Sequence, residues 1–116
     1  MEVAVSESRI EALYNRLKQY EKLGLFPKSE GKIRAFIHIF TKENVEKGER
    51  LNEIAEEVSR LEEVKEVNIL TGQWDLLIKV EVNDVRELAY FVVEKLRKIP
   101  GVERTITSII LRSISK

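Results

Sequence analysis

A short stretch around Gly72 carries the groups that would recognise a small zwitterion. A glycine turn presents the backbone N–H groups of Gly72 and Gln73 to a carboxylate, and Asp75 can accept hydrogen bonds from an ammonium group. Trp74 lies between Gln73 and Asp75 in the sequence, and its ring would form one wall of the binding pocket. The alternative is an ordinary turn, in which Gly72 supplies a positive φ, Trp74 packs in the core and Asp75 bonds nearby backbone. Residue types alone favour the ordinary turn.

Two threonines near the end of the chain form a second candidate. Thr105 and Thr107 alternate along one predicted strand, so their hydroxyl groups share a face and could bind the carboxylate of the same ligand. Threonine is also simply common in strands, and that interpretation is the simpler one for either residue alone. Ser108 lies on the other face and has no role here.

Few residues could support catalysis or bind a metal ion. The chain has no cysteine and one histidine, His38, which no serine or cysteine nucleophile motif accompanies, so we expect a satisfied interface histidine. The interspersed Arg50, Arg60 and Lys65 argue against a metal site in the acidic run, which we interpret as a solvated helix face. That run comprises Glu53, Glu56, Glu57, Glu62 and Glu63. We predict no catalytic residue, no metal and no cofactor.

The composition indicates one globular domain. The chain has 116 residues, 43% of them hydrophobic, and 20 basic residues balance 20 acidic ones, which argues against a globally electrostatic binder of nucleic acid or membrane surfaces. No run approaches the roughly 18 apolar residues of a membrane span, and the first residues lack signal-peptide features, so we expect a cytoplasmic protein. High charge of both signs without cysteine is typical of heat-adapted proteins.

The hydrophobic pattern predicts the elements that must position these candidates. A helix from about residue 9 to 23 ends at Gly24, and a linker to residue 31 separates it from a domain over 32–116. Period-two and helical patterns then alternate. The predicted elements are a strand over 33–40, a helix around 51–61, strands over 67–70 and 74–82, a helix over 85–99 and a strand over 102–112. This β-α-β-β-α-β order predicts an α+β, ferredoxin-like sandwich with an additional N-terminal helix.

One face of the predicted sheet lacks a cover. Both helices would pack on the same face, whereas Phe36, His38, Phe40 and Leu77 point to the other one. Apolar patches of this kind usually bind a partner. We therefore expect these four residues to form the interface of a homodimer.

Three short pieces of the sequence resemble the effector-binding (RAM) domain of the Lrp/AsnC, or feast/famine, transcriptional regulators. They are Val64–Val67, Thr71–Leu77, and Ile99–Thr105 together with Thr107. The resemblance covers about residues 32–111. It implies a dimer formed through the sheets, further assembly into rings, and small amino-acid effectors bound where dimers meet. The family commonly has a tyrosine where Trp74 stands, so the larger ring changes the size of the pocket.

The first segment is similar to part of the DNA-binding unit of that family. Residues 15–26 resemble the end of its DNA-recognition helix and the following turn, but the two helices that should precede it are missing, so a helix-turn-helix cannot be completed. Six basic against five acidic residues over 1–32 give no phosphate-binding footprint. They are Arg9, Arg16, Lys18, Lys22, Lys28 and Lys32 against Glu2, Glu7, Glu11, Glu21 and Glu30.

The sequence thus predicts a stand-alone effector-sensing domain that oligomerises, binds a small amino acid and influences transcription indirectly, in combination with full-length relatives. We expect no direct, specific DNA binding and no membrane partner. Two alternatives stay open. One is a small dimeric ferredoxin-like enzyme of the monooxygenase type, which needs a polar residue in the cavity between sheet and helices. The other is a purely structural oligomer whose pockets stay empty.

Overall fold

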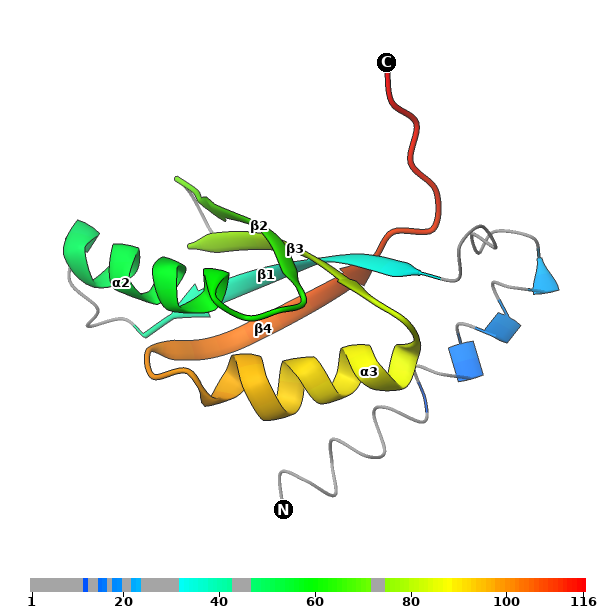
Figure 1. Ribbon diagram of the computed structural model, residues 1–116, viewed down its shortest axis with the longest axis horizontal. Coiled ribbons are helices and arrows are strands. Elements are labelled where there is room, and N and C mark those ends of the chain that lie inside the picture. Colours follow the sequence, from blue (N-terminus) through cyan, green and yellow to red (C-terminus); the bar gives the residue numbers. More distant parts are fainter. Residues whose placement is uncertain are drawn as a thin grey trace.

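The chain folds into strands and helices in the order β-α-β-β-α-β (Figure 1). The structure is a computed structural model and describes residues 12, 15, 16, 18, 19, 22, 23, 32–42, 47–71 and 75–116. The elements are β1 Ile33–Thr41, α2 Lys47–Ser59, β2 Val64–Ile69, β3 Leu76–Val82, α3 Val85–Tyr90 and β4 Val102–Ile109. The predicted N-terminal helix and the boundary at residue 32 fall largely outside the described residues and stay predictions.

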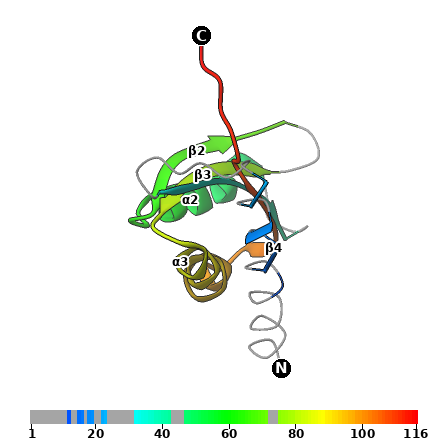
Figure 2. The same cartoon turned by 90° about the vertical axis from the view of Figure 1, so that its right-hand side faces the viewer.

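The four strands form one antiparallel sheet in the order β2-β3-β1-β4. β1 lies between β3 and β4, and both helices pack on the same side of the sheet (Figure 2). The predicted α+β class and βαββαβ order are confirmed. Several bounds differ from the prediction. The first helix spans Lys47–Ser59 rather than about 51–61, β2 begins at Val64 rather than at 67, β3 begins at Leu76 rather than at 74, and β4 ends at Ile109 rather than at 112.

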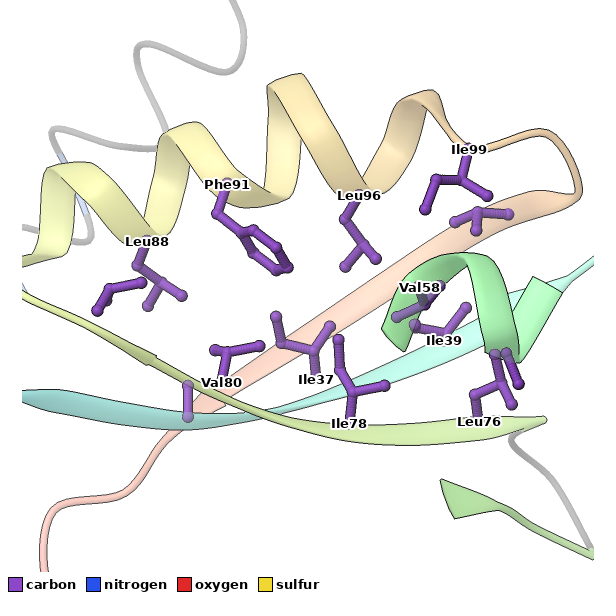
Figure 3. Packing of buried hydrophobic residues seen from close by; sticks show 14 of the residues in the cluster. Ile37, Ile39, Val58, Leu76, Ile78, Val80, Leu88, Phe91, Leu96 and Ile99 are labelled. Atoms are coloured by element: carbon purple, nitrogen blue, oxygen red, sulfur yellow. The ribbon is translucent and has the colours of Figure 1, made fainter. Parts of the chain in front are cut away.

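The core lies between the sheet and the helices (Figure 3). Alternate residues of β1 and β3 point to this side, as the period-two pattern predicts. Leu88, Phe91 and Leu96 of the second helical segment point down onto them, and Val58 of α2 closes one end (Figure 3). The strand residues that they cover are Ile33, Ala35, Ile37, Ile39, Leu76, Ile78, Val80 and Val82.

The second helical segment begins as predicted but does not stay α-helical. The backbone N–H of Glu87 donates to Asp84 Oδ1 at 2.8 Å, and Glu87 Oε1 accepts from the N–H of Asn83 at 2.8 Å, so the expected capping pair is present. After Tyr90 the segment widens into a π-helix, η2 Phe91–Lys95, and tightens into a 3-10 turn, η3 Leu96–Lys98. The N–H of Leu96 is accordingly shared between the carbonyls of Phe91 and Val92.

Candidate functional site

Asp75 closes the connection between β2 and β3. Its carbonyl accepts a hydrogen bond from the N–H of Leu70 at 2.9 Å, and its own N–H donates to the carbonyl of Ile39 in β1 at 3.1 Å. The base of the loop is therefore fixed on two sides. Gly72, Gln73 and Trp74, the other candidates in this loop, lie outside the described residues.

The side chain of Asp75 is bound to the end of β1. Its Oδ2 atom accepts hydrogen bonds from Thr41 N at 2.8 Å and Thr41 Oγ1 at 2.7 Å, and both residues are half-buried. A carboxylate oxygen with two short donors is well satisfied. Within the described residues no donor lies on Oδ1 of Asp75, so this is the oxygen that an ammonium group could reach. The contact matches the ordinary-turn interpretation, in which Asp75 bonds backbone, and the role of Asp75 in ligand binding stays a prediction.

Thr41 was missed by the sequence analysis. It follows a strand of apolar residues and stands 34 positions before Asp75, so no local pattern joins the two. The pairing of β1 with β4 shifts register between Phe40 and Thr41, where β4 holds one extra residue. This bulge lies beside the residue that holds the hairpin.

Thr105 and Thr107 lie on the helix-facing side of β4. They pair with Ile39 and Ile37, whose side chains are buried in the core, and residues opposite each other in a ladder share a face. Both threonines are half-buried. β1 lies between their strand and β3, and Asp75 donates its N–H to Ile39, the ladder partner of Thr105, so Asp75 and Thr105 flank the same residue of β1.

The four proposed interface residues do share the face opposite the helices. His38 lies at its centre, paired with Leu77 on β3 and with Ile106 on β4. Phe36 and Phe40 flank His38 along β1, and the guanidinium of Arg104 lies 4.2 Å from the centre of the Phe40 ring. α2 and α3 lie on the opposite side of the sheet, and the four residues are half-buried (Figure 2).

Ile106 extends this apolar surface and was not among the candidates. It alternates with Thr105 and Thr107, so the period-two pattern of the strand was the signal that could have found it. Its side chain is 43% exposed. An isoleucine at this position adds to the area that a partner would cover.

The prediction that Glu63 lies on a solvated helix face is wrong. The residue is only 9% exposed, and Lys95 Nζ lies 2.7 Å from its Oε2 atom. Oε1 of Glu63 is buried and has no hydrogen-bond partner within the described part of the chain. The hydrogen bond to Glu63, opposed by some desolvation, raises the pKa of Lys95 above its ordinary value. The pair joins the end of the α2–β2 turn to the π-helical segment.

Neither a metal centre nor a membrane span is found in the described residues. No three His, Asp or Glu side chains gather there closely enough to hold a metal ion. None of the helices in this part of the chain combines the length and the apolar character that crossing a bilayer requires.

With the fold and these contacts in place, comparison with known proteins identifies the family. The family model described as the Lrp/AsnC ligand binding domain matches residues 34–116, which include both helices and all four strands except Ile33, the first residue of β1. The chain belongs to the Lrp/AsnC family. An uncharacterized HTH-type transcriptional regulator of Pyrococcus abyssi is 34% identical to it over 120 residues, covering 98% of this chain and 72% of the regulator.

Other similar proteins match smaller parts of their own length. An HTH-type regulator of Pyrococcus horikoshii is 42% identical over 57 residues, and the match spans only 38% of that regulator. A homocitrate synthase of Sulfurisphaera tokodaii is 33% identical over 90 residues, which make up 18% of that enzyme.

Solved structures have the same fold. A Thermus thermophilus protein is 33% identical, with a TM-score of 0.62, and the match covers 72% of this chain and 99% of that one. A Neisseria meningitidis transcriptional regulator in complex with L-methionine has a TM-score of 0.64 at 24% identity, covering 90% of this chain and 72% of that one.

Proposed function

We propose that this chain is an effector-sensing and oligomerising domain that binds a small amino acid and acts on transcription indirectly. The observation that carries the proposal is the match of the whole βαββαβ unit to a ligand-binding domain family of transcriptional regulators. The homocitrate synthase relative supports a sensing role that does not depend on DNA binding, since a similar sequence there lies within an enzyme. No catalytic role is part of this proposal.

The amino acid would bind at the β2–β3 hairpin, where that hairpin meets neighbouring chains. A zwitterion needs N–H donors for its carboxylate and an acceptor for its ammonium group, and Gly72, Gln73 and Oδ1 of Asp75 offer both. Trp74 would line the side-chain pocket. Thr105 and Thr107 lie on another strand, on the far side of β1, and would offer their hydroxyl groups to the same ligand.

The subunits would associate through the open sheet face. Phe36, His38, Phe40 and Leu77 give it an apolar centre, and Ile106 enlarges it. A second copy presents the same patch, so a two-fold interface would cover both at once. Higher assembly would then build on this homodimer.

Titration calorimetry and thermal shift with the common amino acids test the proposed ligand, beginning with L-methionine. Binding should raise the melting temperature progressively, with the logarithm of ligand concentration above the dissociation constant, because the ligand binds only the folded state. N-acetyl-L-methionine and L-methionine methyl ester are matched controls, since the first lacks the ammonium group and the second the carboxylate. Both should bind more weakly than the parent amino acid. No response to any amino acid would contradict the proposal.

The proposed indirect action leads to a separate prediction about DNA binding. The protein alone should show only weak, sequence-indifferent binding in gel shifts at low salt, and full-length relatives should be able to take it into mixed oligomers. Tight binding of the isolated chain to one defined site would contradict this part of the proposal.

A purely structural oligomer is the second candidate, and the Asp75–Thr41 contact is the observation that favours it. Part of the carboxylate that should receive the ligand already fixes the fold. The enzyme alternative has less support. Glu63 is the buried charged residue of the described chain, and its pairing with Lys95 explains its presence there.

A further inference from the structure

The segment that follows β4 leaves the sheet without a partner. The backbone N–H of Ile110 still donates to the carbonyl of Arg34 at 2.8 Å, which continues the pairing of β4 with β1. From Leu111 onward the backbone makes no hydrogen bond to another described residue, and both views show the segment running away from the body (Figures 1 and 2). The side chain of Ile114 is 72% exposed. The segment therefore exposes an isoleucine side chain and backbone groups that have no partner among the described residues.

The edge strand β2 also has backbone groups without a partner strand. It pairs with β3 on one side only, so its outer N–H and C=O groups have no strand partner in the described part of the chain. Ile69, at its end, is 47% exposed although its ladder partner Leu76 is fully buried. β2 has six residues, and residues 111–116 are enough to run along it.

The surroundings of the two edge strands differ in charge. Each strand is neutral by itself, because β2 carries Lys65 and Glu66 and β4 carries Glu103 and Arg104. β2 contacts α2, in which Glu53, Glu56 and Glu57 outnumber Arg50, whereas β4 contacts the 3-10 turn that contains Arg97 and Lys98. The segment 111–116 contains Arg112 and Lys116 and no acidic residue, so the surroundings of β2 suit it better.

We propose that residues 111–116 of one copy add to β2 of a second copy as an extra strand, with Ile114 lying against Ile69. This inference rests on the homodimer of the proposed function and adds a second contact to it. Backbone hydrogen bonds along the edge would supply affinity, and the isoleucine pair and the opposite charges would set the register. In a two-fold dimer the exchange is reciprocal, so both segments and both edges are covered.

The absence of native cysteine allows a clean test. Ile69→Cys and Ile114→Cys are made as separate full-length proteins, mixed in equal amounts and oxidised, and covalent dimers are resolved on non-reducing gels. We expect a covalent dimer in the mixture that neither protein gives alone. A mixture of Ile114→Cys with Glu103→Cys, an exposed position on β4 outside the proposed sheet-face interface, is the matched control and should give none.

Several outcomes would overturn the proposal while leaving the homodimer intact. These are linkage of Ile114→Cys to Glu103→Cys, self-linkage of Ile114→Cys alone, or no mixed product from proteins that sediment as dimers. Wild-type protein that sediments as a monomer would instead overturn the homodimer itself. As a second measurement, a chain ending at Ile110 should dimerise with a dissociation constant raised about tenfold. An unchanged constant would contradict the proposal.

Discussion

The Oδ2 atom of Asp75 lies 2.7 Å from Oγ1 and 2.8 Å from N of Thr41, so one carboxylate oxygen fixes the β2–β3 hairpin to the end of β1. The same residue offers its other oxygen as the proposed acceptor for an ammonium group. Under the proposed function, ligand binding and local stability would be coupled at Asp75. A substitution there must be evaluated for both effects.

Removing the carboxylate should destabilise the fold. Asp75→Ala leaves the half-buried N–H of Thr41 without its acceptor and should lower the free energy of unfolding by about 1–3 kcal/mol. Thr41→Val removes only the hydroxyl donor and should cost less, about 1 kcal/mol. Urea unfolding of both variants measures this order. The reverse order would show that the backbone contact contributes little.

The effect on ligand binding can be separated from the effect on stability. Asp75→Ala should weaken amino-acid binding by one to two orders of magnitude, because a charge-assisted hydrogen bond contributes about 1.5–3 kcal/mol. Thr41→Val disturbs the anchor but keeps Oδ1 and should bind nearly as the wild type does. Calorimetry with the same amino acid compares them. Equal affinities in wild type and Asp75→Ala would remove Asp75 from the site.

A charge placed on the open sheet face should separate the subunits. Phe36→Glu would bury a carboxylate at the interface without a partner, and the dimer dissociation constant should rise by about two orders of magnitude or more. Asn52→Glu adds the same charge on the exposed side of α2 and serves as the control. Sedimentation velocity at micromolar concentration gives the result. A dimeric Phe36→Glu protein would contradict the sheet-face interface.

The Glu63–Lys95 pair should make stability depend on alkaline pH. Hydrogen bonding to Glu63 raises the pKa of folded Lys95 above its ordinary 10.5. The contribution of the pair is therefore complete below that ordinary value and is lost as the pH rises through the raised value. Lys95→Met should melt several degrees below the wild type at pH 7, and the difference should shrink in strong alkali. Lys98→Met, at an exposed position, is the control and should melt as the wild type does.

Gly101 should tolerate no side chain. Its φ is +99°, and a methyl group placed on it would lie 2.5 Å from Cδ1 of Ile54 in α2. Gly101→Ala should cost about 1–3 kcal/mol through the backbone conformation, with the clash in addition. Adding Ile54→Val removes the clashing atom and should recover only part of the loss. Full recovery in thermal unfolding would mean that the clash alone is responsible.

The parts of the fold that depend on short-range patterns could be predicted from the sequence. Asp84 and Glu87 predicted the start of α3 because a capping pair is local, and alternation along β1 placed Phe36 and His38 on the open face. The π-helical segment was not predicted. Phe91–Lys95 has ordinary helical composition, and the wider turn depends on packing and on the position of Lys95 beside Glu63.

The candidate site was predictable only where it is local. Asp75 was identified by its place in a glycine turn, but its partner Thr41 is 34 residues away and only the folded sheet brings them together. Glu63 was misjudged for a similar reason. It stands in a run of exposed glutamates. Its burial becomes visible only in the folded chain, where the pairing of β2 with β3 shifts register between Val64 and Glu66 and Lys95 of the second helical segment lies beside Glu63. The roles of Gly72, Gln73 and Trp74 stay predictions.

The position of β1 in the sheet has a consequence for how the chain matures on the ribosome. β1 is synthesised first, yet it pairs with β3 and β4 and with no strand near it in sequence. The ladder between β1 and β4 cannot form until residues 102–109 have been synthesised. β1 therefore stays unpaired until β3 has been synthesised, and its other edge stays open until β4 follows, so the nascent chain exposes strand edges through which it can associate with other chains.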